Sequence, residues 1–252
     1  MKKKYYILTA VISYFVILIA TIPAKPVTDI FSDDAVLAIQ GVSGTIWNGK
    51  AYLISANNMQ FKKTNWSFNL WKLLIGKLSI DASTTFLNNK ITTELGISFL
   101  GTYFANDLST KIAAKEVAQL ANIPLVQLDG MISLNIEHAQ WKQGESPLAT
   151  GEILWSNATV TVADTVPLGN ISIVLGESEQ ELLSAEIKNQ GGSININGTA
   201  ELISEADYAV NIKLLPTATT NDNIKQSLGL FAAKQSNGEY LFKQSGSLDD
   251  IM

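Results

Sequence analysis

Short runs in which apolar and polar residues alternate constrain the fold of this 252-residue chain more than any other feature. Such alternation places apolar side chains on one face of a β-strand and polar side chains on the other. The polar positions are rich in Ser, Thr and Asn, which suit the solvated face of an antiparallel sheet. We expect about ten to twelve strands at this spacing. The clearest runs are NWSFNLW, KLSIDASTTF, ITTELGISF, NISIVL, SININGTAEL and YAVNIKL.

Turn-forming dipeptides separate these runs. Asn48-Gly49, Asn197-Gly198 and Asn237-Gly238 are strong hairpin signals, and Asn88-Asn89 is a weaker one. The sequence therefore predicts a mainly β fold assembled by successive hairpins.

Two segments break the alternation and predict short helices. Apolar residues recur at helical spacing over 109–121 and 221–232, and WKLLIG over 71–76 fits one further helical turn. No linker rich in Pro, Gly and Ser divides residues 27–252, so one β-rich domain is expected there. A seam around residues 105–127 is the alternative division.

The N-terminal segment MKKKYYILTAVISYFVILIATIPAKP predicts a membrane anchor. Its apolar part, Tyr5 to Ile22, has 18 residues, near the lower end of the ~17–25 that cross a bilayer as a helix. Tyr5 and Tyr6 stand where an interfacial aromatic belt would lie, and the three lysines before them favour the cytoplasmic side. We expect a cytoplasmic tail over 1–4, a transmembrane helix over 5–24 that includes Ile22, and residues 27–252 outside the cytoplasm.

A signal peptide cleaved after Ala24 is the alternative for the same segment. Its apolar stretch would exceed the usual length of roughly 7–15 residues, and Ile22 is a poor small residue at the −3 position. The uncleaved anchor is therefore favoured. Both interpretations place the rest of the chain outside the cytoplasm.

Composition excludes several classes of function. All 18 basic residues are lysine. Residues 26–252 contain 14 of these lysines and all 23 acidic residues, so this part of the chain is acidic. An acidic body disfavours nucleic acid, which is normally bound by a basic surface. The chain has no cysteine, which excludes disulfides, thiol catalysis and zinc–thiolate sites.

The segment GVSGTIWNGKAYLI, residues 41–54, contains the GxxxxGK spacing of a phosphate-binding loop. Residue 51 is alanine instead of Ser or Thr, and the continuation is strand-like where such a loop requires a helix. We therefore interpret the segment as a β-hairpin closed by Asn48-Gly49, with Ile46 and Trp47 on its first strand.

Other candidate residues give little support for catalysis. His138 is the only histidine, so it cannot build a two-histidine metal site, and no GxSxG motif accompanies it. We interpret it as a partly buried strand residue, with a hydrolase centred on His138 as the alternative. The acidic pairs are interpreted as solvated loop charges, and no catalytic, metal-binding or cofactor-binding residue is assigned. These pairs are Asp33-Asp34, Glu177-Glu179 and Asp249-Asp250.

Tryptophan supplies the candidates for a partner contact. Aromatic residues on strands are usually core, but an exposed aromatic can anchor an interface. Trp47 and Trp155 each follow a glycine-led segment and are the predicted partner-contact residues. The full set is Trp47, Trp66, Trp71, Trp141 and Trp155.

Taken in order along the chain, several segments resemble the family of type II secretion system protein N, also called general secretion pathway protein N. No single segment is specific, and their order and spacing carry the resemblance. The segments are the lysine-flanked N-terminus, GVSGTIWNG, NWSFNLWKLLIGKLSI, GEILWSNATV, PLG, GTAEL, YAVNIKLLP and NGEYLFKQSGSL.

The resemblance implies a single-pass inner-membrane protein whose bulk lies in the periplasm. It further implies an accessory, non-enzymatic subunit without cofactor, which supports export of folded proteins across the outer membrane by contacting other secretion-system subunits. The family also looks distantly like AsmA-type β-groove proteins, which implies a curved antiparallel sheet with an apolar groove and lipid binding or transfer as the alternative function. A sandwich-like domain with a filled interior is the other expected form of the sheet.

Overall fold

The computed structural model describes residues 2–31, 37–56, 59–121, 126–162, 164–204 and 207–247. Helices are few and mostly short: α1 (Lys2–Ala20), α2 (Ala24–Phe31), the 3-10 helix η1 (Leu70–Ile75), α3 (Ala114–Leu120) and α4 (Asp222–Leu228). The strands are β1 (Leu37–Gln40), β2 (Ser43–Gly44), β3 (Asn48–Ala56), β4 (Met59–Phe68), β5 (Lys77–Phe86), β6 (Asn89–Ser98), β7 (Tyr103–Ala113), β8 (Gln127–Trp141), β9 (Leu148–Thr161), β10 (Thr165–Glu177), β11 (Leu183–Gln190), β12 (Ile194–Leu202), β13 (Asp207–Pro216), β14 (Ala233–Lys234) and β15 (Tyr240–Ser247).

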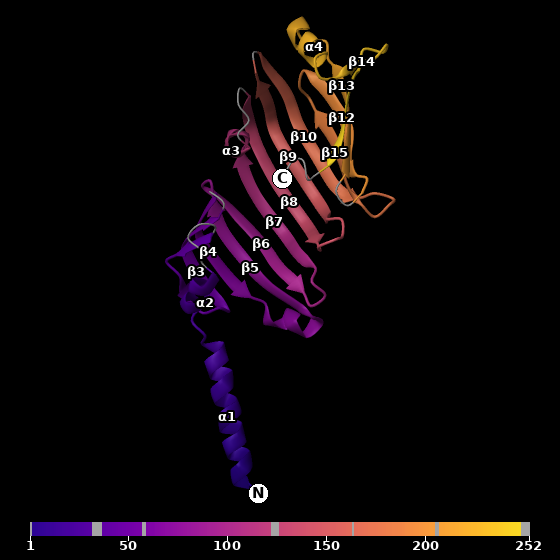
Figure 1. The fold of residues 1–252 in the computed structure, drawn as a ribbon. Helices are drawn as coiled ribbons and strands as arrows, with labels where there is room; N and C mark the ends of the chain where they lie inside the picture. The colour runs from indigo at the N-terminus through magenta and orange to yellow at the C-terminus, as the bar shows by residue number, and fades with distance from the viewer. Residues whose placement is uncertain are drawn as a thin grey trace. The chain divides into compact units, whose positions relative to one another are not determined.

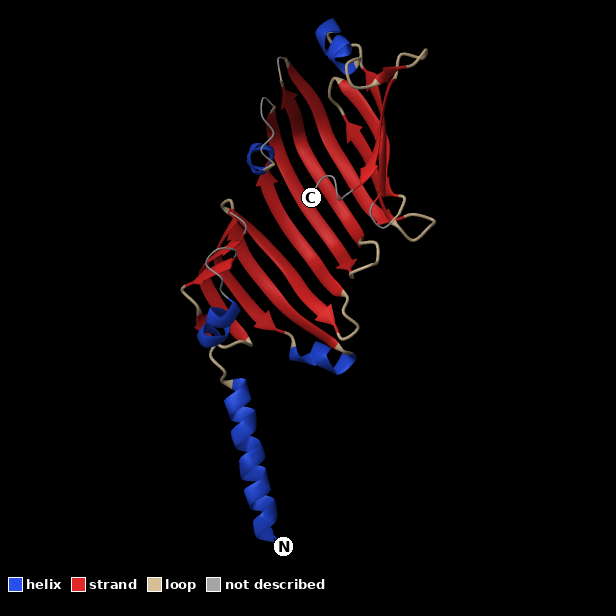
Figure 2. Cartoon of the chain, in the orientation of Figure 1, coloured by secondary structure: helices blue, strands red, loops and turns tan. Residues whose placement is uncertain are grey.

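The described strands belong to a single antiparallel sheet, as Figures 1 and 2 show. Their order is β1-β3-β4-β5-β6-β7-β8-β9-β10-β11-β12-β13-β15-β14, and β2 pairs with β3. Neighbours in the sheet are nearly always neighbours in the sequence, the pattern expected of successive hairpins. The mainly β prediction is confirmed. The sandwich-like alternative is wrong for the described strands, because they do not divide into two packed sheets.

Two compact units divide the chain, residues 1–92 and 93–252. The boundary falls within β6, before the seam considered at residues 105–127. The first unit contains α1, α2, η1 and strands β1 to β5, and the second contains α3, α4 and strands β7 to β15.

The turn predictions have mixed outcomes. Leu87 and Asn88 turn the chain between β5 and β6 with φ of 47° and 62°, and Gly238, with φ of 85°, lies in the turn before β15. Asn197-Gly198 was predicted as a hairpin turn, and this is wrong because Gly198 pairs with Ile212 inside β12. A Cβ at Gly198 would lie 2.5 Å from the Asn211 carbonyl oxygen, so the glycine permits close strand approach.

The helix predicted over 109–121 is only half correct. Residues Ser109 to Ala113 continue β7 and pair with β8, and α3 begins at Ala114. Of the residues whose spacing suggested this helix, Val117 and Leu120 lie in α3, whereas Ala113 ends β7. For residues 109–113, pairing with β8 outweighs local helix preference. The helical turn predicted over 71–76 is confirmed as η1, which ends at Gly76 in a left-handed conformation.

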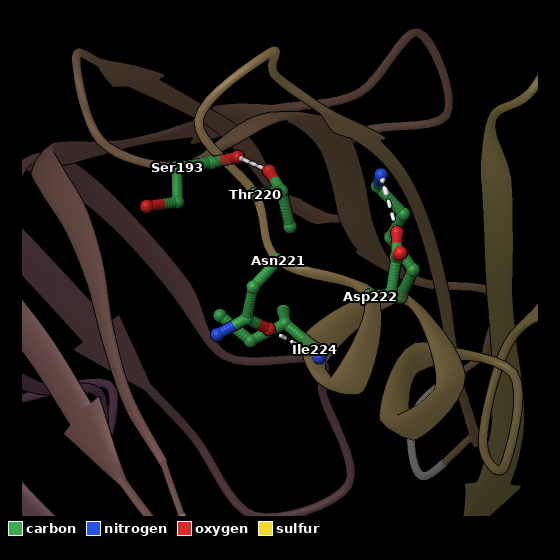
Figure 3. A network of polar contacts seen from close by, with 6 residues as sticks. Ser193, Thr220, Asn221, Asp222 and Ile224 are labelled. Atoms are coloured by element: carbon green, nitrogen blue, oxygen red, sulfur yellow. Dashed lines mark hydrogen bonds and ion pairs between the residues drawn. The ribbon is translucent and has the colours of Figure 1, made fainter.

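The helix predicted over 221–232 is confirmed in its first part as α4, which Figure 3 shows from close by. The Asn221 side chain caps it, because its Oδ1 accepts a hydrogen bond from the Ile224 amide at 2.8 Å. Just before the cap, the Thr220 hydroxyl donates to the Ser193 carbonyl and ties the helix to the start of β12. Phe231 lies beyond the helix and is exposed.

A small apolar core lies under α4. Ile224 and Leu228 of α4 pack with Ile194, Ala232 and Tyr240. Partly buried side chains from the neighbouring strands complete this cluster, and they are Val166, Leu168, Ile196, Leu214 and Phe242. The cluster fastens the last hairpins of the second unit to one another.

Candidate anchoring site at the start of the sheet

The helix α1 leaves its apolar side chains uncovered. Twelve large apolar or aromatic side chains from Tyr5 to Ile19 are each at least 45% exposed, Tyr5 and Tyr6 among them. Thr9 in the helix and Thr21 just beyond it bond locally, since the Thr9 hydroxyl donates to the Tyr5 carbonyl at 2.9 Å and the Thr21 hydroxyl to the Ile17 carbonyl at 2.8 Å. Among the described residues, no helix combines the length and apolar character required of a membrane span.

The helix ends earlier than the 5–24 segment predicted from the sequence. Its last residue is Ala20, Ile22 lies in the break that follows, and α2 starts at Ala24. Pro23 accounts for the break, because a proline cannot donate the backbone hydrogen bond that would continue the helix. Pro26 stands in the first turn of α2, where a missing amide is tolerated.

The predicted hairpin at residues 41–54 is present, but its turn differs from the prediction. Gly44 pairs with Gly49, so Thr45 to Asn48 form the turn and Asn48-Gly49 starts β3. The Thr45 amide donates to the Asn48 carbonyl at 2.9 Å, and the Asn48 amide donates to the Thr45 hydroxyl at 3.1 Å. These bonds close the turn around Ile46 and Trp47. We call Gly44 to Gly49 the GTIWNG loop.

The GTIWNG loop holds the C-terminal end of α1. The Trp47 indole Nε1 donates to the Ile19 carbonyl at 2.8 Å, and the Ile46 amide donates to the Ile22 carbonyl at 3.1 Å. Carbonyls in the last turn of a helix lack intrahelical partners. The loop adds a second donor to the Ile19 carbonyl, which also accepts the Ile22 amide at 3.3 Å, and it bonds the Ile22 carbonyl just beyond the helix. It therefore acts as a side-chain and backbone cap.

The same loop is fixed to the sheet from the other side. The Trp66 indole donates to the Ile46 carbonyl at 3.1 Å, and the Phe68 amide donates to the Trp47 carbonyl at 2.7 Å. The rings of Trp47 and Phe68 meet edge to face at 5.2 Å between centroids. Gly49 leaves room for this arrangement, since a Cβ there would lie 2.4 Å from Trp66 Cζ2. The loop therefore joins α1 to strands β3 and β4.

Both predicted partner-contact residues are half-buried and internally bonded. Trp47 bonds α1 as described, and Trp155 Nε1 donates to the Asp129 carbonyl at 2.9 Å across the β8–β9 pair. Gly130 has φ of 105°, and a Cβ there would lie 2.8 Å from Trp155 Nε1. Their indole N–H groups thus serve the fold. A contact of Trp47 or Trp155 with another protein stays a prediction.

His138 belongs to a polar chain that crosses three strands. His138 Nδ1 lies 2.6 Å from Asn106 Oδ1, and Asn106 Nδ2 donates to Glu94 Oε2 at 2.9 Å. Glu94 is only 8% exposed. An amide next to the imidazole lacks the negative charge that a Ser-His-Asp triad places there to stabilise the imidazolium. The geometry therefore gives the hydrolase alternative no support.

Sequence alternation failed to identify Glu94. In ITTELGISF it assigned Leu95 to the apolar face, yet Leu95 is exposed and Glu94 is buried. The acidic pair Glu177-Glu179 is exposed, as expected of solvated charges, and the other two pairs, Asp33-Asp34 and Asp249-Asp250, lie outside the described residues. Within the described ranges, no three or more His, Asp or Glu residues gather as a metal site would require.

Two exposed apolar groups were not predicted. The first is η1, where Leu70, Trp71, Leu74 and Ile75 are exposed, although Leu70 belongs to the alternating run NWSFNLW, which predicts a strand. The second, in the other unit, is the aromatic patch, which we define as Phe99, Leu100, Tyr103 and Trp141. Its Tyr103 and Trp141 rings stack at 5.7 Å across the β7–β8 pair. Contiguous exposed apolar side chains of this kind mark interaction sites.

Comparison with known proteins gives a consistent result. Residues 35–243 match the family model described as type II secretion system (T2SS), protein N. The type II secretion system protein N of Vibrio cholerae serotype O1 is 23% identical over 222 residues, which cover 84% of this chain and 85% of that protein. The protein of the same name from Aeromonas hydrophila is 24% identical over 219 residues, covering 83% and 84%. No solved structure matches the chain significantly.

Proposed function

The chain belongs to the family of type II secretion system protein N, and from this premise we propose that it is an accessory inner-membrane subunit of that system. It supports the export of folded proteins across the outer membrane through contacts in the periplasm. The family match over residues 35–243 carries the proposal, because it spans most of the β-rich region. The relatives are named as secretion-system proteins and not as enzymes, and neither name mentions lipid transfer.

The proposed location follows from α1. The 16 residues of α1 beyond the lysines, Tyr5 to Ala20, rise about 24 Å at 1.5 Å per residue, and residues 21–24 extend the segment toward the ~30 Å of a hydrocarbon core. Its uncovered apolar side chains and locally satisfied threonines suit a lipid environment. We place residues 1–4 on the cytoplasmic side, residues 5–24 in the membrane and residues 27–252 in the periplasm, with Tyr5 and Tyr6 at the cytoplasmic interface.

The proposed contact with other subunits uses the aromatic patch. Its side chains are exposed, whereas the indole N–H groups of Trp47 and Trp155 donate hydrogen bonds to carbonyls within the chain. Stacked, rigid aromatic side chains are effective interface anchors, since they bury a large area at a low cost in conformational entropy. Tyr103 and Trp141 are paired across β7 and β8, so the sheet holds their stacked rings in place.

Affinity purification of the full chain from gently solubilised membranes tests this proposal. Quantitative mass spectrometry is expected to find other type II secretion subunits enriched with the wild-type chain. The double substitution Tyr103→Ser/Trp141→Ser should lower their recovery several-fold. The control is Leu230→Ser, which changes an even more exposed apolar side chain in the turn after α4. Equal recovery with the patch variant would contradict the contact, and no enrichment with the wild type would contradict the subunit role.

A further inference from the structure

Within the described residues, η1 and the glycine that ends it form an uncovered apolar segment outside α1. Leu70 is 53%, Trp71 80%, Leu74 79% and Ile75 69% exposed, four of six consecutive residues. Isolated exposed apolar residues are ordinary, but a continuous group of them marks a surface that is covered in use. The left-handed Gly76, with its amide bonded back to Leu73 at 3.1 Å, fixes the segment as a compact projection.

The position of η1 points to what covers it. The segment joins the end of β4 to the start of β5, as Figure 2 shows. Phe68 at the end of β4 bonds Trp47 and meets its ring edge to face, and Trp47 bonds Ile19 in the last turn of α1. Leu70 follows Phe68 by two residues, or about 7 Å of extended chain. The projection therefore starts beside the point where α1 meets the sheet.

The chemistry of the segment fits a membrane surface. Residues 69–80 contain Lys72 and Lys77 and no acidic residue. Tryptophan is characteristic of the membrane–water interface, where its ring sits at headgroup level, and lysine commonly flanks such segments. Apolar segments of this kind bury their side chains about 5–10 Å into the boundary between headgroups and acyl chains.

From this geometry we propose that η1 is a second membrane contact, which inserts Trp71, Leu74 and Ile75 into the periplasmic face of the bilayer that holds α1. The occupant is the lipid bilayer and not a protein partner. With α1 alone the first unit has one attachment to the membrane and can rotate about it. With η1 inserted beside it, the unit has two. This inference rests on the proposed placement of α1 in the membrane.

Site-directed spin labelling of the full chain tests the inference, and the absence of native cysteine makes single labels straightforward. The chain is reconstituted in nanodiscs of phosphatidylethanolamine and phosphatidylglycerol with a label at Leu74→Cys. Labels at Ile12→Cys in α1 and at Leu230→Cys, an exposed apolar turn residue, serve as the lipid and water references. The measurement is the ratio of accessibility to oxygen and to a water-soluble nickel complex. The ratio at position 74 should be several-fold above that at position 230.

Each outcome decides one proposal. A water-like ratio at position 74 overturns the inference, whatever is found at position 12. Shielding of position 74 from both oxygen and nickel also overturns it, because that result indicates a protein contact. A water-like ratio at position 12 overturns the placement of α1, and so separates failure of the proposed function from failure of η1. Brominated lipids provide a second measurement, since they should quench the wild-type fluorescence more than that of a Trp71→Leu variant.

Discussion

At the scale of single residues, four positions of the GTIWNG loop have a definable role. Gly44 takes φ of 90° at the turn, and Thr45 closes the turn with its hydroxyl. Trp47 caps α1, and Gly49 leaves space for the Trp66 ring. The spacing that imitates a phosphate loop therefore arises from backbone conformation and tryptophan packing.

Replacing Gly49 by alanine should destabilise the chain by about 1–3 kcal/mol, the usual cost of forcing extra volume into a packed site. The new Cβ would lie 2.4 Å from Trp66 Cζ2 and 2.9 Å from the Thr45 carbonyl oxygen, and the latter is backbone that cannot move aside easily. Denaturant unfolding of the full chain in detergent measures the change. Gly176→Ala is the control, because it meets open space at ordinary φ and should be neutral or slightly stabilising. Equal stability of the two variants would contradict the packing argument.

The sequence predicts those features of this site that depend on neighbouring residues, and it misses those that depend on residues far apart in the chain. The presence of a hairpin followed from local glycine and asparagine chemistry. The place of its turn did not, because Trp66 approaches from another strand and determines the use of Gly49. Glu94 was missed for the same reason, since Asn106 on the neighbouring strand makes its burial tolerable.

At the scale of elements, alternation predicted strands well and boundaries less well. Residues 109–113 fall within the segment predicted as a helix yet extend β7, because pairing with β8 satisfies their backbone. Asn197-Gly198 has the composition of a turn yet lies inside β12. The helices that sequence located correctly, η1 and α4, have local end signals in Gly76 and Asn221.

The cap of α4 gives the prediction at this scale. Asn221→Ala removes the acceptor for the Ile224 amide and should cost about 1 kcal/mol, the typical value for an N-cap. Because Ile224 and Leu228 pack into the core under α4, the loss should also speed hydrogen exchange in this helix. Gln226→Ala, an exposed change within the same helix, should stay within roughly 0.5 kcal/mol of wild type. Similar losses for both variants would argue against the cap.

At the scale of the whole molecule, the order and spacing of segments along the chain indicate the family, and no single motif does. The relatives share 23–24% identity over most of the chain, and no segment alone would identify the family. The order of the strand runs, the GTIWNG loop and the lysine-flanked first helix together carried the resemblance. The exposure of η1 and of the aromatic patch could be seen only in the structure. Alternation in the sequence identifies an apolar face but does not tell whether another part of the protein covers it.

Export is the property that tests the central claim most directly. The measurement is the fraction of a type II-secreted hydrolase found in the medium and in the periplasm of a strain lacking this gene, with and without the gene restored on a plasmid. The proposed role predicts that the extracellular fraction falls, that the folded enzyme accumulates in the periplasm, and that the restored gene reverses both changes. An unchanged extracellular fraction in the strain without the protein would contradict the claim that it supports secretion.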